Sequence, residues 1–338
     1  MRLLARAAAL LVTNGLCVLA SIDGTVMNRT TGKPERGVTI TLVKPGQGGM
    51  QTLGTTASDA AGHFVFEKDQ PGGGPQLLQA NYKGVNYNKL MTPNIPTSNV
   101  ELEIYEVTAS PAVARVAQQM LLLEPSQNQL AVDETVIVQN DSKETYNDPG
   151  RGSMRFYLPP AANGQVRVNA QGPQGMPLPR PAEKTNENGI FKVDFPIKPG
   201  ETQFDVAYVL PTGSPLTFNG RVTGVKGMQA GPLRLIAPPG VTFTGNDLQN
   251  VGTEPKTGAT IYTVTAPDAF AVNIAGTGAL RQADQSGPVD SSDQPQVTEG
   301  PPQIYRHLVW LVALAFAVLA VGLAVLFRSS PVRSPYGN

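Results

Sequence analysis

Few side chains in this chain of 338 residues are of the types that usually carry out enzymatic chemistry. The sequence contains two histidines, His63 and His307, and one cysteine, Cys17. Neither histidine stands in a His-x-x-Glu pattern, and little material is left for a metal-ligand set, a thiol nucleophile or a Ser-His-Asp triad. We therefore predict no catalytic residues, no metal site and no cofactor.

The acidic loop at 140–152 reads NDSKETYNDPGRG and gathers several oxygen ligands. Asp141, Glu144 and Asp148 are of the kind that calcium prefers, but their spacing does not match the D-x-[DN]-x-[DN]-G calcium loop. A polar surface loop is the favoured interpretation. A metal-dependent hydrolase that uses the loop around Asp141 remains as a less favoured alternative.

Three tyrosines are the candidate ligand-facing residues. Tyr82 and Tyr87 flank a predicted hairpin turn at Lys83-Gly84, and Tyr105 is expected to point away from the face that Leu102 and Ile104 would bury. Exposed aromatic rings could stack on a sugar ring. The favoured alternative is that they form cross-strand pairs that stabilise a sheet.

Two segments fit the N-glycosylation acceptor pattern, Asn28-Arg29-Thr30 and Asn140-Asp141-Ser142. The pattern has a consequence only in a eukaryotic secretory pathway.

The composition limits which elements can position these residues. Gly (35) and Pro (30) supply 65 of the 338 residues, which excludes a helical bundle because both residues interrupt helices. The 26 basic and 26 acidic side chains cancel to a net charge of zero, so the chain is not expected to bind nucleic acid.

Apolar residues between 21 and 280 recur with a period of two, which is typical of half-buried strands. Turn signals rich in Gly, Pro and Asp separate the strands at short intervals. The fold class predicted is all-β, with two or three tandem antiparallel β-sandwiches. The clearest alternations are Val38/Ile40/Leu42, Phe64/Phe66, Val100/Leu102/Ile104 and Phe204/Val206/Tyr208/Leu210.

The first of these segments also shows a family resemblance. The stretches IDGTV, TGKPERGVTITLV, SDAAGHFVFE and LLQANYKGVNY, between Ile22 and Tyr87, resemble the carboxypeptidase regulatory-like domain, a small transthyretin-like β-sandwich. The resemblance implies a domain over residues 21–108, with close backbone approach at Gly24 and a tight turn ending at Gly62. It implies no peptidase activity, because that family's zinc-binding catalytic domain has no counterpart in this sequence.

Residues 109–112 predict a joint, and 113–280 are expected to form one or two further sandwiches. Residues 113–123 (VARVAQQMLLL) fit either a short amphipathic helix or a strand, and we favour a strand that leads into a hairpin at 126–129.

Both ends of the chain indicate export and anchoring. Residues 1–20 combine two arginines with an apolar stretch, as a signal peptide does. Residues 308–327 form an uncharged apolar run of bilayer-spanning length. The Pro-rich acidic span 281–305 predicts a disordered linker, and the basic tail 328–338 should face the cytoplasm with 21–306 outside.

Together these features predict an exported, single-pass, non-enzymatic protein of the cell envelope that binds a protein or glycan partner or acts as a scaffold. A membrane-tethered carbohydrate-binding module is the main alternative.

Overall fold

The computed structural model describes residues 22–46, 49–66, 74–92, 95–173 and 175–280, which belong to one compact unit ending at Gln282. The predicted signal peptide, linker, membrane-spanning segment and cytoplasmic tail lie outside these ranges. Within them, helix is limited to two 3-10 turns, Pro111–Val113 and Pro160–Ala162. No helix among the described residues is long and apolar enough to cross a bilayer. The all-β prediction is confirmed for this part of the chain.

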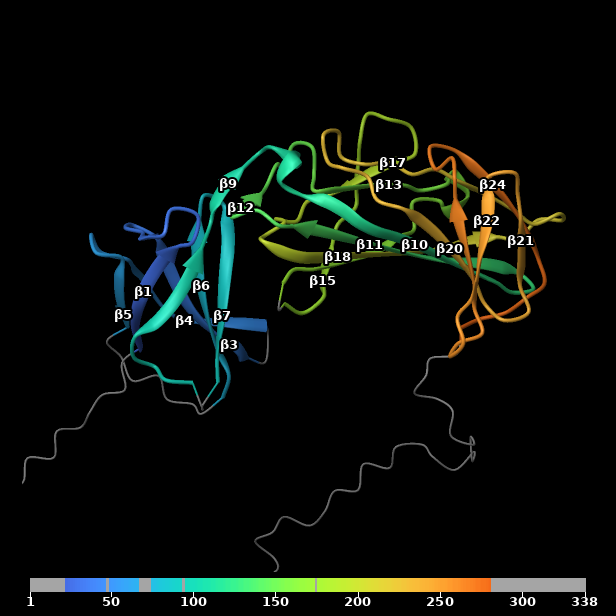
Figure 1. Cartoon of the computed structure of the whole chain (residues 1–338). Helices are drawn as coiled ribbons and strands as arrows, with labels where there is room; N and C mark the ends of the chain where they lie inside the picture. Colours follow the sequence, from blue (N-terminus) through green and yellow to red (C-terminus); the bar gives the residue numbers. More distant parts are fainter. Residues whose placement is uncertain (1–21, 47–48, 67–73, 93–94, 174, 281–338) are drawn as a thin grey trace, which may run out of the picture. The chain divides into compact units, whose positions relative to one another are not determined.

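Two facing sheets form the first β-sandwich (Figure 1). In one sheet β1 pairs with β2 and β5 and, in parallel, with β8; the other sheet has the order β4-β3-β6-β7. The parallel β1–β8 pair departs from the antiparallel prediction, because it joins segments more than 70 residues apart that local patterning cannot relate. The strands are β1 (Ile22–Asn28), β2 (Lys33–Pro34), β3 (Thr39–Gly46), β4 (Gly49–Ala57), β5 (His63–Phe66), β6 (Gln76–Tyr82), β7 (Val85–Met91) and β8 (Val100–Ile104).

The alternating residues predicted for this sandwich form its core. Ile40, Phe64 and Leu102 are each at most 2% exposed, and they belong to one cluster of buried side chains. Gly24 is needed where β1 meets β8, because a Cβ atom there would lie 2.0 Å from the carbonyl oxygen of Val100. The architecture is compatible with the predicted sandwich over residues 21–108.

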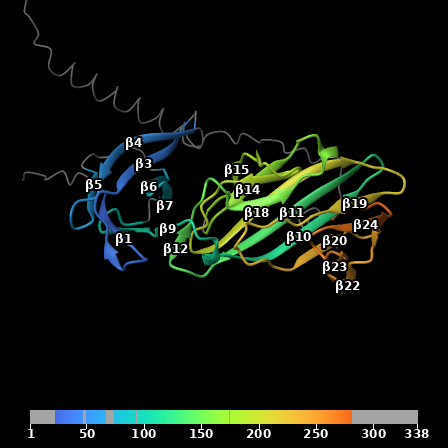
Figure 2. The ribbon, with the colours of Figure 1, turned by 90° about the horizontal axis from the view of Figure 1, so that it is seen from above.

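The second region is built on an eight-stranded sheet of order β15-β14-β18-β11-β10-β20-β23-β22. Two three-stranded sheets, β13-β17-β16 and β19-β24-β21, contribute to the same core, and Figure 2 shows β18, β11 and β10 running side by side. Strands β9 (Glu106–Thr108) and β12 (Glu144–Tyr146) form a separate two-stranded sheet. The strands of the second region are β10 (Arg115–Pro125), β11 (Gln129–Asn140), β13 (Met154–Tyr157), β14 (Arg167–Gln171), β15 (Leu178–Arg180), β16 (Glu183–Lys184), β17 (Ile190–Val193), β18 (Gly200–Pro211), β19 (Thr217–Gly220), β20 (Leu233–Ala237), β21 (Thr242–Thr244), β22 (Leu248–Thr253), β23 (Thr260–Val264) and β24 (Phe270–Ala275).

Strand β11 shows how the sheet divides its two faces. Leu130, Val132, Glu134, Val136 and Val138 alternate along it and are buried, whereas the intervening residues Ala131, Asp133, Thr135 and Ile137 are partly or fully exposed. The face of the sheet opposite the core carries these partly or fully exposed residues of β11. We call it the open face.

One cluster of buried side chains runs through the second region, from Ala114 to Ile274. Most of 113–123 belongs to β10, and Ser126 and Gln129 close a tight hairpin with a backbone hydrogen bond of 2.8 Å. This confirms the strand and hairpin prediction for that segment and contradicts the helical alternative.

Candidate functional site

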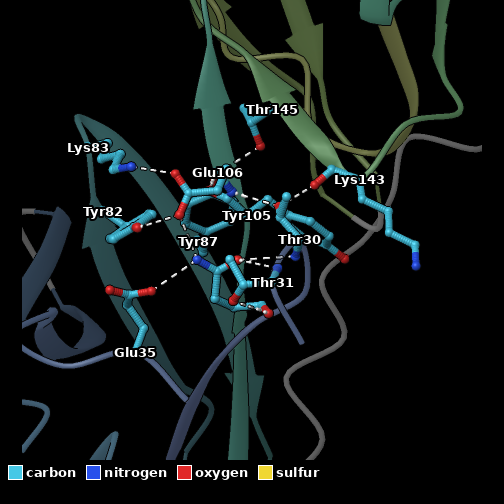
Figure 3. Close-up of polar contacts among 11 residues, drawn as sticks. Thr30, Thr31, Glu35, Tyr82, Lys83, Tyr87, Tyr105, Glu106, Lys143 and Thr145 are labelled. Carbon is cyan, nitrogen blue, oxygen red and sulfur yellow. Dashed lines mark hydrogen bonds and ion pairs between the residues drawn. The ribbon is translucent and has the colours of Figure 1, made fainter. Parts of the chain in front are cut away.

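The short strands β9 and β12 connect the first β-sandwich to the second region. They pair in parallel, with Glu144 opposite Glu106 and Tyr146 opposite Thr108. Strand β12 is tied to the second region by two backbone hydrogen bonds between Tyr146 and Ile197, of 2.9 and 3.0 Å. Val107 packs against the core of the first sandwich. We call the side chains in contact around this strand pair the junction (Figure 3); its main residues are Asn28, Thr30, Tyr82, Lys83, Tyr87, Tyr105, Glu106 and Thr145.

Glu106 is the polar centre of the junction (Figure 3). Its Oε1 accepts hydrogen bonds from Asn28 Nδ2 at 2.8 Å and from the Tyr82 hydroxyl at 2.7 Å, and its Oε2 forms an ion pair with Lys83. Asn28 is 0% exposed, and its amide nitrogen also donates to Glu35 at 3.0 Å. The buried amide is thereby satisfied, which a buried polar group requires.

The charges of the junction stabilise one another. The hydrogen bond from Lys83 is the main reason why the pKa of Glu106 lies below its ordinary value. Partial burial, followed by the hydrogen bond to Glu106, raises the pKa of Tyr82 to about 12. Glu106 is therefore ionised and Tyr82 neutral at neutral pH, so neither side chain is set up to exchange a proton there.

A second contact crosses from β7 to β12. The Tyr87 hydroxyl donates to the carbonyl oxygen of Tyr105 at 3.0 Å and shares a hydrogen bond of 2.9 Å with Thr145 Oγ1. Burial raises the pKa of Tyr87 to about 12. The Lys198 ammonium lies 5.0 Å from the centre of the Tyr87 ring and donates to the Asn86 carbonyl oxygen at 2.5 Å. Burial lowers the pKa of Lys198 to about 8.

A third contact uses the threonine of the first acceptor pattern. Thr30 Oγ1 accepts from the Glu106 backbone N–H at 2.9 Å and donates to the backbone carbonyl of Lys143. The loop that follows β1 therefore touches the segment that precedes β12.

The three predicted tyrosines all lie at the junction, but they differ in exposure. Tyr87 is 3% exposed, so its ring is not available to a sugar, and the prediction that it faces a ligand is wrong. Its ring centre lies 6.0 Å from that of Tyr105, but the two are not a cross-strand pair, because Tyr105 lies outside the strands, between β8 and β9. Tyr82 and Tyr105 are half-buried, and burial raises the pKa of Tyr105 as well. Tyr87 is buried because it belongs to the alternation that β7 turns toward the core.

The carboxylates of the loop at 140–152 do not converge. Asp141 is engaged by Arg115 and Gln139, whereas Asp148 pairs with Arg151 at 3.2 Å. Glu144 lies in β12. No group of three or more His, Cys, Asp or Glu side chains that could hold a metal ion occurs among the described residues.

Both asparagines of the acceptor patterns are buried. Asn28 is 0% exposed and Asn140 is 1% exposed. The Asn140 amide donates to the carbonyl oxygens of Glu144 and Ile197. Neither side chain is accessible to a glycan in the folded protein. His63, by contrast, is exposed on β5, as a strand residue facing solvent should be.

Two hollows lie on opposite faces of the eight-stranded sheet. On the core face a cavity of about 10 Å³ is lined by Gln119, Glu134 and Tyr208, among others. Glu134 is 6% exposed and accepts from Gln119 Nε2 at 2.5 Å. Burial raises the pKa of Glu134 to about 7. On the open face a hollow of about 380 Å³ includes Asp133 and Arg167 in its lining.

Several junction residues were not anticipated from the sequence, and Asn28 and Glu106 are the most important. One signal could have found Asn28, because it continues the inward-facing series Ile22, Gly24 and Val26 with a polar side chain. A polar residue at a core position requires a buried partner. No local pattern indicates that the partner is Glu106, which lies 78 residues away.

Comparison with known proteins names no family. No protein-family model matches the chain, and no curated protein matches it. Among solved structures, an M1 zinc metallopeptidase from Deinococcus radiodurans aligns at 14% sequence identity over 47% of this chain and 42% of that chain, with a TM-score of 0.27. A substituted form of the same enzyme bound to a Tyr-Ser-Ala substrate aligns at 15% identity over 52% and 50%, also with a TM-score of 0.27. The chain spans half or less of these metallopeptidases, and TM-scores this low do not indicate a shared fold.

Proposed function

We propose that this chain is an exported, membrane-anchored protein of the cell envelope that acts as a non-enzymatic binding or scaffold module. The junction is the observation that supports this most. Polar side chains that could serve a substrate, such as Glu106 and Lys83, are instead bonded to one another where β9 meets β12. These contacts hold two β-rich regions together, which is a structural role rather than a catalytic one.

Sequence supports the location. The apolar stretch within 1–20, preceded by Arg2 and Arg6, is typical of an export signal, and 308–327 has the length and composition of a bilayer-spanning helix. Arg328 and Arg333 follow that run, which favours a cytoplasmic C-terminus.

Protease treatment of intact spheroplasts tests this proposal with the full chain carrying an epitope tag after Asn338. We expect external protease to remove residues 21–306 and to leave a short tagged fragment in the membrane. Detergent lysis before treatment is the control, and it should expose the tag as well. Protection of the large region with loss of the tag would overturn both export and orientation.

A membrane-tethered carbohydrate-binding module is the alternative, and the partial exposure of Tyr82 and Tyr105 is what favours it. If this alternative holds, the unaltered chain should bind on a glycan array, and Tyr82→Ala or Tyr105→Ala should abolish that binding. Calorimetry with calcium or zinc tests the remaining hydrolase alternative.

A further inference from the structure

The hollow of about 380 Å³ lies on the open face of the eight-stranded sheet. Ala131 and Asp133 of β11 and Ala207 and Val209 of β18 line it, together with the segment 165–167 at the start of β14. The alanine methyl groups leave room that larger side chains would fill. The lining is therefore small and aliphatic at its floor, with polar residues at its sides.

Strand register places two opposite charges on either side of this floor. Ala207 is paired with Asp133 on one neighbouring strand and with Arg167 on the other. Directly paired residues share a face of the sheet, and adjacent strands lie about 4.8 Å apart. The backbones of Asp133 and Arg167 are thus separated by roughly 10 Å across Ala207.

Both charged groups are free to meet a ligand. Asp133 and Arg167 are exposed, and neither forms any of the ion pairs found among the described residues. Asp205, on the same face, is by contrast engaged by Thr135 and Gln203. Partial burial raises the pKa of Asp133, and the charge of Arg167 opposes that shift.

We propose that this hollow binds a short zwitterion with the dimensions of a dipeptide, its ammonium group at Asp133 and its carboxylate at Arg167. An extended dipeptide spans about 7 Å between its ends. The two side chains extend from backbones roughly 10 Å apart, so a ligand whose charges lie about 7 Å apart can be placed between them. In a single amino acid the two charges lie closer together, which suits this separation less well. A guanidinium group also suits a carboxylate because it can donate two parallel hydrogen bonds. Small side chains of the ligand would lie on Ala131, Ala207 and Val209.

Isothermal titration of the full chain with Ala-Ala tests this proposal, with N-acetyl-Ala-Ala, Ala-Ala amide and free alanine as comparison ligands. We expect Ala-Ala to bind and each single cap, as well as alanine, to weaken binding at least tenfold. This site does not depend on membrane anchoring or on the junction, so the result is independent of the topology experiment.

Charge-specific variants make the test sharper. Asp133→Asn should remove the preference for a free amino end, and Arg167→Gln should remove the preference for a free carboxyl end. Ala207→Leu should fill the hollow and abolish binding while leaving both charges in place. Arg234→Gln, on β20 and outside the hollow, is the matched control and should bind as the unaltered chain does.

Three outcomes would overturn the inference. They are no binding of Ala-Ala at millimolar concentration, equal binding of capped and uncapped ligands, and binding that Ala207→Leu leaves intact. Circular dichroism of each variant reports whether its fold is retained. If a variant fails to fold, the ligand series on the unaltered chain still decides the question.

Discussion

Glu134 places a carboxyl group on the core face of β11, between the buried residues Val132 and Val136. Its hydrogen-bonding partner is Gln119, and Tyr208, Tyr157 and Arg221 line the same small cavity. The cavity of about 10 Å³ has room for roughly one water molecule. Burial favours the neutral acid, so the pKa of Glu134 rises from 4.5 to about 7. Between pH 4.5 and about 7, Glu134 therefore keeps its proton in the folded protein but loses it in the unfolded chain.

The free energy of unfolding should accordingly fall as pH rises from 4.5 to about 7 and level off above that. A carboxyl group with a raised folded-state pKa contributes fully below the unfolded value and loses that contribution above the folded one. At pH 8.5 we expect Glu134→Gln to unfold at a higher urea concentration than the unaltered chain. Its free energy of unfolding should be larger by up to about 3 kcal/mol. At pH 5 the difference should be small.

Urea titrations at both pH values measure this effect. Glu201→Gln, on an exposed position of β18, is the control and should not alter the pH dependence. An unchanged pH profile in Glu134→Gln would show that Glu134 does not titrate in this range.

At the scale of elements, the sequence was most informative where neighbours along the chain decide the structure. The alternation of Ile40 and Leu42 and the turn at Gly62 are local features, and the structure contains both. Pairings such as β1–β8 and β10–β20 are parallel and join distant segments. Periodicity assigns a residue to a face, but it does not determine which strand lies beside it.

Comparing substitutions at two glycines distinguishes the cost of a left-handed backbone from the cost of a steric clash. Gly62 and Gly84 both have φ of +78°. A Cβ atom on Gly62 would lie 2.7 Å from Pro34 Cβ, whereas one on Gly84 would meet nothing within 4 Å. We expect Gly84→Ala to cost about 1 kcal/mol through its left-handed backbone, and Gly62→Ala to cost clearly more. Thermal unfolding of the two variants checks this, and equal losses would contradict the close approach at Gly62.

At the scale of the whole molecule, the junction is where the first β-sandwich and the second region are in contact. Its contacts pair residues that are far apart in sequence, such as Tyr87 with Thr145, 58 residues away. The sequence does show three tyrosines within a short span, but the hydroxyl partners of Tyr82 and Tyr87 lie on distant segments of the chain. Neither the burial of Tyr87 nor the role of Glu106 could be read from local spacing for that reason.

Thr145→Val tests the junction without leaving a cavity. Thr145 is 0% exposed, and the change removes its hydrogen bond with Tyr87 while keeping nearly the same shape. We expect a loss of about 1 kcal/mol and faster amide hydrogen exchange at 144–147, with exchange in β3 unchanged. Thr135→Val, whose hydroxyl bonds within the open face, is the control and should leave exchange at 144–147 unaltered. Uniformly faster exchange in both variants would argue against a specific link.

Two hydrogen bonds near the end of the described residues would carry a pulling force from the segment after β24 to the end of β10. The Gly278 backbone N–H donates to the Pro125 carbonyl oxygen, and the Leu280 N–H donates to the Glu124 carboxylate at 2.6 Å. A pull applied beyond Leu280 is therefore divided between β24 and the end of β10. Strand β10 is held by β11 along its length and by β20 on its other side. Force directed along β10 would therefore load its hydrogen bonds to both neighbouring strands at once.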